Sequence, residues 1–255
     1  MAYSGTPSFK VLLTGFQGWG TITTNPSELI GKQLDGAVLQ LPDHSKFRTG
    51  SEFNPGVSSV TSSDPELSTG SAIVTFQPLR VSYREVEKLI PAAHESGEWD
   101  YIVHLGVAAG KKTCAIETGS NTTGYTLRDV DGAMAPELED GRGISCDEAR
   151  WECTLDYQEC CEELNDMGFE HVKLSADPGN FLCGYTTACS LKSAYGRVAK
   201  DEGRKPIPVV FFHVPLLKET DPTAPYTLSE LTEIVRALCG FAARQASTNV
   251  RRHLD

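Results

Sequence analysis

Lys10-Val11-Leu12-Leu13-Thr14 is a short apolar run that stops at Gly15, and it predicts a buried strand. Asn25-Pro26-Ser27-Glu28 then predicts the start of a helix, because asparagine is a good N-cap and proline suits the first helical turn. We expect this helix to end near Leu34. A strand, a loop and a helix in this order form the repeating unit of α/β proteins.

The same alternation continues along the chain. Apolar runs that stop at glycine or at polar residues predict further strands at residues 72–76, 101–106, 113–117, 171–175 and 207–213. Helical spacing of apolar residues predicts helices at residues 83–96, 147–167, 182–200 and 227–245. This alternation predicts an α/β fold with a mostly parallel, twisted sheet and helices on both faces.

The predicted elements form a single domain, residues 1–255, because we find neither a linker nor an internal repeat. Residues 1–8 are expected to be a short polar N-terminal tail. Residues 42–71 are rich in Ser, Gly, Pro and Thr and predict a loop-like excursion. In an open α/β sheet the functional site lies beyond the carboxyl ends of the strands, so residues at or just past those ends are the first candidates.

The composition is that of a globular protein, with 40% hydrophobic residues and a formal net charge of −11. A surface of this sign repels phosphate backbones and anionic lipids, so we expect no nucleic-acid and no membrane partner. The polar N-terminus does not resemble a signal peptide, and no apolar run reaches the ~18 residues of a membrane span. We therefore expect the eight cysteines to be free thiols in a reducing, cytoplasmic environment. The lack of a Cys-x-x-Cys pair argues against a zinc ribbon.

Cys183 stands where a predicted strand turns into a predicted helix. A thiol in the first turn of a helix lies near the positive end of the helix dipole and near backbone N–H groups that have no partner within the helix. Both features favour the thiolate, which is the nucleophilic form, and the same N–H groups can hold an oxyanion. The alternative is a buried cysteine that behaves as a small hydrophobe.

Two further residues at strand ends have the chemistry that a thiol nucleophile needs. His213 ends the apolar run at residues 207–213, where an imidazole can act as a general base. Glu117 ends the run at residues 113–117, where a carboxylate can orient that imidazole. His213 could instead be a core histidine bonded to the backbone, and Glu117 a solvated surface residue.

Other conspicuous residues have simpler interpretations. The loop at residues 15–20 is not a phosphate-binding glycine motif, and its two aromatic rings suit either the wall of a ligand pocket or the core. Three cysteines that recur every seven residues predict one buried side of the helix at residues 147–167 rather than a metal site: Cys146, Cys153 and Cys160. We expect His94 on an exposed helix face and His104 inside a buried strand.

Taken with their neighbours, these residues resemble the pyroglutamyl-peptidase I family of cysteine peptidases, which release N-terminal pyroglutamate. The resemblance covers roughly residues 9–245, apart from the excursion at residues 42–71, and its motifs follow the family's order. The motifs are the opening strand with its aromatic loop and Asn25-Pro26-Ser27, residues 81–107, Glu117 with Gly124-Tyr125, residues 177–183 around the nucleophile, and Phe212-His213-Val214-Pro215.

The resemblance implies a three-layer α/β/α fold, no metal, no cofactor, and peptides with an N-terminal pyroglutamate as substrates. It implies a catalytic triad of Cys183, His213 and Glu117. It also implies that four largely apolar residues line the pyroglutamyl pocket: Phe16, Trp19, Phe181 and Leu182. Arg128 matches a family arginine near the site.

The chain departs from the family pattern at three positions of this expected site. Trp19 replaces a phenylalanine, Pro178 an alanine, and Gly184 an asparagine or aspartate. These departures motivate an alternative, in which a degraded relative binds pyroglutamyl N-termini without cleaving them. A nucleoside phosphorylase-like enzyme is a third hypothesis that rests on fold analogy alone, and the lack of an evident basic phosphate site argues against it. The sequence makes no prediction of the oligomeric state.

Overall fold

The computed structural model describes residues 9–42, 68–136, 150–153, 155–169, 172–200 and 206–251. Seven strands form one sheet in the order β2-β3-β1-β4-β9-β5-β8. Their bounds are β1 Phe9–Phe16, β2 Val38–Pro42, β3 Ser68–Leu79, β4 Tyr101–Val107, β5 Cys114–Glu117, β8 Val172–Ser175 and β9 Val209–Val214. Two neighbouring pairs are antiparallel, β2 with β3 and β5 with β9, and the other four are parallel. The predicted mostly parallel sheet is confirmed.

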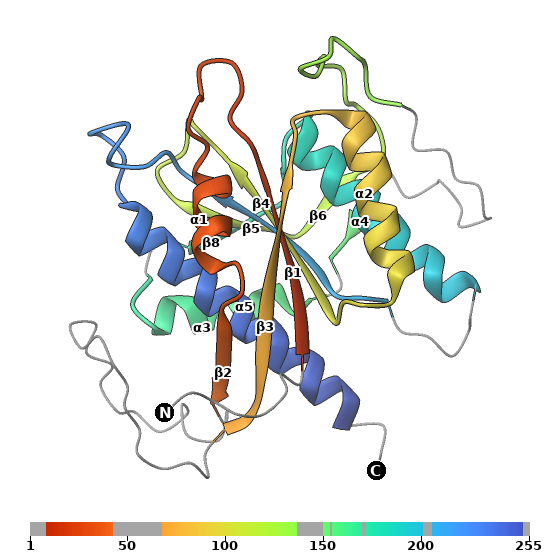
Figure 1. Ribbon diagram of the computed structural model, residues 1–255, viewed down its shortest axis with the longest axis vertical. Coiled ribbons are helices and arrows are strands. Elements are labelled where there is room, and N and C mark those ends of the chain that lie inside the picture. The colour runs from red at the N-terminus through yellow and green to blue at the C-terminus, as the bar shows by residue number, and fades with distance from the viewer. Residues whose placement is uncertain are drawn as a thin grey trace.

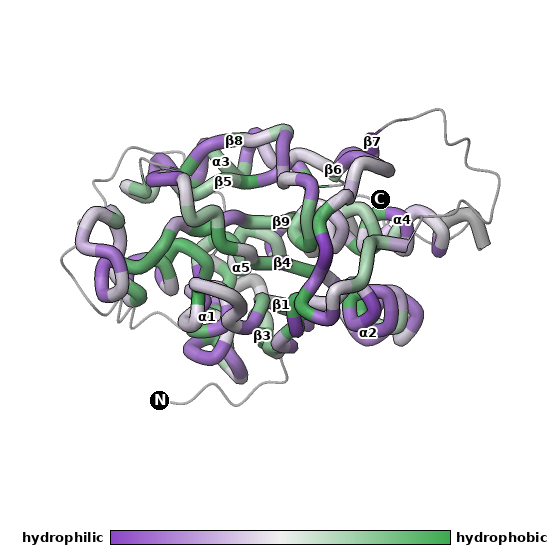
Figure 2. The backbone as a smooth tube through the Cα atoms, turned by 90° about the horizontal axis from the view of Figure 1, so that it is seen from above, coloured by the Kyte–Doolittle hydropathy of each residue, from purple (hydrophilic) through white to green (hydrophobic). Residues whose placement is uncertain are grey.

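Helices cover both faces of the sheet (Figure 1). On one face lie α2 (Tyr83–Ser96) and α4 (Leu182–Lys200), which pack against each other. On the other face lie α1 (Pro26–Leu34), α3 (Tyr157–Asp166) and α5 (Leu228–Arg251). Viewed from above, strands β8, β5, β9, β4, β1 and β3 follow one another across the molecule with the helices to either side (Figure 2). This is the three-layer α/β/α arrangement that the resemblance implies.

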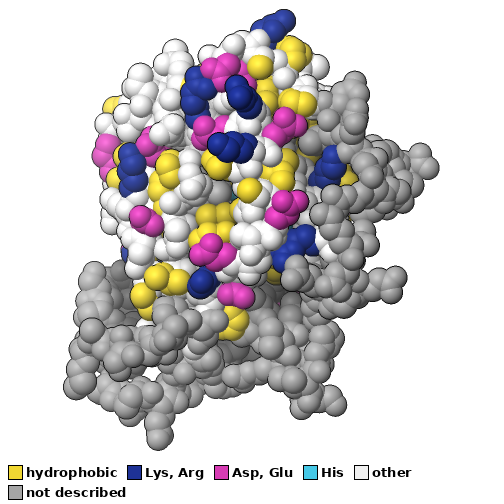
Figure 3. All heavy atoms as spheres, turned by 45° about the vertical axis from the view of Figure 1, so that its right-hand side comes forward, with side chains coloured by type: hydrophobic (Ala, Val, Ile, Leu, Met, Phe, Trp, Pro, Cys, Tyr) yellow, Lys and Arg dark blue, Asp and Glu magenta, His cyan; other side chains and the backbone are white. Residues whose placement is uncertain are grey.

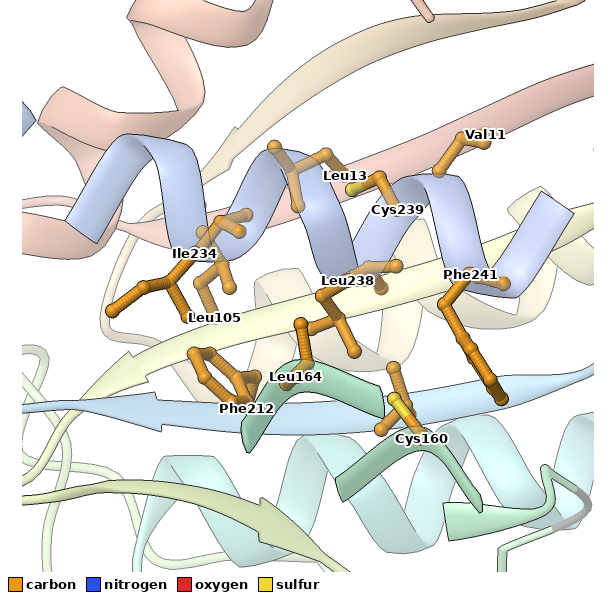
Figure 4. Packing of buried hydrophobic residues seen from close by; sticks show 14 of the residues in the cluster. Val11, Leu13, Leu105, Cys160, Leu164, Phe212, Ile234, Leu238, Cys239 and Phe241 are labelled. Carbon is orange, nitrogen blue, oxygen red and sulfur yellow. The ribbon is translucent and has the colours of Figure 1, made fainter. Parts of the chain in front are cut away.

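Alternation along the central strands decides which residues meet which helix layer. Residues such as Leu13, Leu105 and Phe212 join the core on the α5 side, where Ile234 and Leu238 pack toward them (Figure 4). The alternate positions on β1, β4, β9 and β5 therefore face α4. Five of the residues at these positions matter for the site: Thr14, His104, Phe211, His213 and Glu117.

Most predicted elements are observed, and the N-terminal helix start is formed as expected, with the Asn25 side chain accepting a hydrogen bond from the Ser27 N–H at 3.1 Å. The prediction of strands missed β2 entirely. Because β2 includes Pro42 and β3 begins at Ser68, both ends of the interval 42–71 belong to strands. Residues 43–67 and the tail at residues 1–8 lie outside the described residues.

The helix expected at residues 147–167 is wrong in its first half. The helix α3 begins only at Tyr157, and residues before it form the short strand β7 (Arg150–Glu152), which pairs with β6 (Gly119–Asn121). Cys153 therefore lies outside the helix, where its backbone N–H donates to the Thr118 carbonyl. The predicted cysteine-lined helix side does not exist at Cys153, and Cys146 lies outside the described residues.

The described surface is mixed in charge on the face that carries α2, where Lys, Arg, Asp and Glu side chains are interspersed with apolar ones (Figure 3). In the part of the chain that the structure describes, no helix combines the length and the apolar composition that crossing a membrane requires.

Candidate active site

Cys183 is the second residue of α4, directly after the loop that leaves β8. The loop is shaped by Asp177, whose carboxylate accepts a hydrogen bond from the Gly179 N–H at 3.0 Å. The helix closes its first turn when the Tyr185 N–H donates to the Phe181 carbonyl at 2.9 Å. Cys183 is half-buried, whereas the other six described cysteines are buried, and all seven are free thiols. Its position therefore combines access with the electropositive end of a long helix.

Glu117 and His213 meet because β5 and β9 are antiparallel. Ala115 lies directly opposite His213, and Glu117 is two residues further along β5, on the same face of the sheet. From this diagonal position the carboxylate Oε1 reaches His213 Nδ1 at 2.7 Å. Glu117 is 1% exposed and His213 8% exposed. The carboxylate is thus held in a water-poor site against one nitrogen of the ring, which fixes how the imidazole is turned.

The Cys183 side chain lies next to the His213 ring and interacts with it. Because Nδ1 is occupied by Glu117, Nε2 is the ring nitrogen that is left for the thiol. Burial disfavours the charged imidazolium, but the Cys183 sulfur and the Glu117 carboxylate outweigh it and raise the pKa of His213 above its ordinary value. Thiol, imidazole and carboxylate therefore form a connected series in which the imidazolium is a favoured partner of the sulfur.

Gly106 on β4 makes room for this series. It is the register partner of His213 on β9. A Cβ atom added at Gly106 would lie 2.8 Å from Cys183 Sγ and 2.7 Å from the Phe211 ring. The thiol can therefore lie over β4, next to His213, only because position 106 has no side chain.

The predicted pocket residues form one aromatic cluster next to Cys183. Phe16 and Leu182 are buried in one core cluster, and Phe181 and Cys183 pack against that cluster. Trp19 is 39% exposed, with its ring centroid 5.3 Å from that of Phe181. These four residues are brought together, with two of them in the core and two nearer the surface.

Arg128, the fifth predicted substrate-binding residue, lies in the loop after Tyr125. It is exposed, and its guanidinium donates to the Gly132 carbonyl within its own loop at 2.7 Å. Among the described residues, no hydrogen bond joins it to Cys183, His213 or Glu117. Nor do the described residues contain a group of three or more His, Cys, Asp or Glu that could hold a metal ion.

Several residues around the site were missed by the sequence analysis. Phe211 lies beside His213, with ring centroids 4.8 Å apart. Ser120 donates a hydrogen bond at 2.8 Å to the Gly184 carbonyl and so ties β6 to the first turn of α4. Alternation along β9 could have revealed Phe211, since it shares a face with His213. Nothing in the sequence indicates the contact of Ser120.

The chain resembles curated peptidases along most of its length. It is 28% identical to human pyroglutamyl-peptidase 1 over 238 residues, which cover 91% of this chain and 88% of the human protein. It is 25% identical to the pyrrolidone-carboxylate peptidase of Pyrococcus furiosus over 212 residues, which cover 82% of each chain. No family model matches the chain.

The chain is similar to the pyroglutamyl-peptidase I family in sequence and in fold.

The fold of the chain matches that of the solved pyrrolidone carboxyl peptidase from Thermococcus litoralis. Its structure matches this chain with a TM-score of 0.69 and 18% identity, covering 94% of this chain and 96% of that one.

The departure from the family pattern at Gly184 has a visible structural cause. A Cβ atom at Gly184 would lie 2.1 Å from the Gly179 carbonyl oxygen and 3.0 Å from the Tyr125 ring. The loop before α4 therefore packs on the helix backbone more closely than an asparagine or aspartate would allow. Pro178, another departure from the family, is buried in this loop.

Proposed function

We propose that this chain is a thiol-dependent omega-peptidase that hydrolyses the amide bond after an N-terminal pyroglutamyl residue. The observation that carries the proposal is the series of Glu117, hydrogen-bonded to His213, and Cys183, whose sulfur lies beside His213 in the first turn of α4. The similarity to this family supports the choice of substrate, because curated relatives are named as pyroglutamyl peptidases. The roles below are proposals for the residues of this series.

In the first half of the reaction, His213 Nε2 takes the thiol proton and the Cys183 sulfur attacks the pyroglutamyl carbonyl carbon. The carbonyl oxygen becomes an oxyanion, which the N–H groups of the first turn of α4 hold. The C–N bond then breaks, and the imidazolium gives its proton to the leaving amine. The products are a shortened peptide with a free amino terminus and a thioester on Cys183.

In the second half, His213 takes a proton from a water molecule, whose oxygen attacks the thioester carbonyl. Collapse of this intermediate releases free pyroglutamate, and the sulfur recovers its proton from His213. The Glu117 carboxylate accepts the hydrogen bond of Nδ1–H, so that Nε2 faces the sulfur. The aromatic cluster of Phe16, Trp19 and Phe181 supplies apolar contacts for the uncharged lactam ring, and Arg128 is proposed as a further substrate contact.

A direct test is the hydrolysis of a fluorogenic pyroglutamyl amide by reduced wild-type protein, compared with Cys183→Ala and with a prolyl amide as the control substrate. We expect turnover of the pyroglutamyl amide alone, and none above background with Cys183→Ala. Folded, reduced wild-type protein that binds the pyroglutamyl amide but does not cleave it would instead support the alternative of a non-catalytic binder.

A further inference from the structure

A buried series of polar side chains crosses the molecule behind the candidate active site. Thr14 Oγ1 lies 2.8 Å from His104 Nδ1, and His104 Nε2 lies 2.8 Å from Ser190 Oγ. Ser190 Oγ also lies 2.8 Å from His94 Nε2. All four residues are at most 1% exposed, so the expectation of an exposed His94 is wrong, whereas buried His104 is confirmed. The series joins β1, β4, α4 and α2 through Ser190.

Both histidines are neutral at ordinary pH, so each ring has one N–H donor and one acceptor nitrogen. This determines which group donates in each hydrogen bond of the series. Burial, with Arg197 nearby, lowers the pKa of His94 to about 4, and burial lowers that of His104 to about 3. Nδ1 of His94 has no hydrogen-bond partner among the described residues. A buried N–H without an acceptor is costly, so His94 Nε2–H donates to Ser190, Ser190 donates to His104, and His104 Nδ1–H donates to Thr14.

The series uses the same strands as the site. His104 precedes Gly106 by two residues on β4 and faces α4 as Gly106 does. Thr14, His104, Phe211 and Glu117 are register partners on the consecutive strands β1, β4, β9 and β5. On the helix, Ser190 follows Cys183 by seven residues, or about two turns on the same side of α4.

The helix α4 is therefore held to β4 at two points. Near its start, Cys183 lies over the side-chain-free Gly106. Two turns later, the Ser190 hydroxyl is bonded to the His104 ring. A packed contact sets how close the helix can come, whereas a hydrogen bond of defined direction sets its rotation and its position along the strand.

We propose that Ser190 is a positioning residue, which through His104 fixes the rotation and height of α4 on the sheet and thereby the alignment of the Cys183 sulfur with His213. The proposal rests on the proposed function of the same site. Loss of the hydroxyl removes none of the reacting groups, but it lets α4 pack differently on β4 and so shifts the Cys183 sulfur. It therefore slows the chemical step more than it weakens substrate binding.

The test compares Ser190→Ala with Ser193→Ala, a matched control because the Ser193 hydroxyl donates at 2.8 Å to the Cys189 carbonyl of its own helix. For both we would measure kcat and KM with the pyroglutamyl amide. We would also measure the rate at which iodoacetamide alkylates Cys183 as a function of pH, reading the modified peptide by mass spectrometry. For Ser190→Ala we expect kcat to fall roughly tenfold to a hundredfold with KM changed less than about twofold. The alkylation profile should move to higher pH, toward that of a thiol without an aligned imidazole.

A second variant, Thr14→Val, removes the far end of the series without altering α4. It should show the same pattern with a smaller amplitude, and the double variant should lose less than the product of the two single losses, because both act through His104. If Ser190→Ala does not fold, Thr14→Val decides alone. The proposal would be overturned if folded Ser190→Ala, even a less thermostable one, kept the wild-type kcat, KM and alkylation profile. If only Thr14→Val folds, the same wild-type values in that variant would overturn it. If the wild type cleaves no pyroglutamyl amide, the proposed function fails, while the alkylation profiles still test the alignment.

Discussion

Cys183 Sγ lies 2.8 Å from the point that a Cβ atom on Gly106 would occupy. We expect Gly106→Ala to push the thiol away from His213, because the new methyl group would also meet the Phe211 ring at 2.7 Å and cannot turn aside. Overpacking of this kind costs about 1–3 kcal/mol of stability. A displaced nucleophile costs roughly a hundredfold in kcat/KM. Steady-state kinetics and urea unfolding measure the two effects.

Gly110→Ala is the control for this substitution, since a Cβ atom there meets nothing within 4 Å. It should keep wild-type kinetics. Wild-type activity in Gly106→Ala would mean that the sulfur is not confined as described.

Glu117→Gln keeps the size of the buried side chain but removes its charge. Because Glu117 and Cys183 together hold the pKa of His213 up against burial, we expect this pKa to fall in the variant. The imidazolium then loses its partner during the reaction, and kcat should drop roughly a hundredfold or more with little change in KM. The pH dependence of kcat/KM measures both effects. The exposed Glu98→Gln should show neither of them, and an equally unaffected Glu117→Gln would remove the carboxylate from the mechanism.

The buried histidines behind the site predict sensitivity to acid. The folded protein holds His94 and His104 with pKa values of about 4 and about 3, whereas both have the ordinary 6.5 once unfolded. Between about pH 6.5 and pH 4 the unfolded chain therefore binds more protons, and the free energy of unfolding decreases as the pH falls. Since one pKa unit corresponds to roughly 1.4 kcal/mol, the loss should reach several kcal/mol.

Urea unfolding at a series of pH values between 7.5 and 4.5 measures this loss. His94→Gln offers an amide N–H in place of Nε2–H but cannot take up a proton, so its stability should depend less steeply on pH. An identical slope in wild type and variant would show that His94 does not contribute.

Gly184→Ala tests whether the close packing of the nucleophile loop is essential. The Cβ atom would lie 2.1 Å from the backbone oxygen of Gly179, so the loop or the first turn of α4 has to shift. We expect a lower melting temperature and at least a tenfold loss of kcat/KM. Gly196→Ala, on the same helix with open space around it, should be neutral or slightly stabilising. Equal behaviour of the two variants would contradict the packing argument.

Trp19→Ala probes the outer wall of the aromatic cluster. The Trp19 ring packs against Phe181 but is 39% exposed, so its removal should leave the fold intact. If the lactam ring binds against it, KM should rise roughly fivefold to tenfold while kcat changes little. An unchanged KM would exclude Trp19 from the pocket.

Much of the framework follows from local patterns. The Asn25 cap, the apolar run at residues 101–106 and the helix from Leu182 have clear signals, because capping and burial act on neighbouring residues. The three residues of the candidate site could be named from the sequence because of their chemistry and their places at or after predicted strands. Their meeting could not be predicted, because it depends on the antiparallel pairing of β5 with β9.

The remaining features depend on contacts between distant segments. A seven-residue spacing near Cys153 imitates a helix, yet the pairing of β7 with β6 takes residues 150–152 into a strand. His94 has the local setting of a surface residue, but it is buried against Ser190, which is 96 residues away. Neither outcome is encoded in the spacing of nearby residues, so only the packed structure reveals it.

The order of the sheet has a consequence for how the protein is made. The strand β9 is the last of the described strands along the chain, yet it lies between β4 and β5. Until β9 leaves the ribosome, the described strands β1 to β4 and the pair β5 and β8 have no strand to join them. Cys183 and Glu117 are then already synthesised while His213 is not, so the nascent chain carries an unassisted thiol. Catalytic competence would arise in one late step, which makes activity a readout of completed folding.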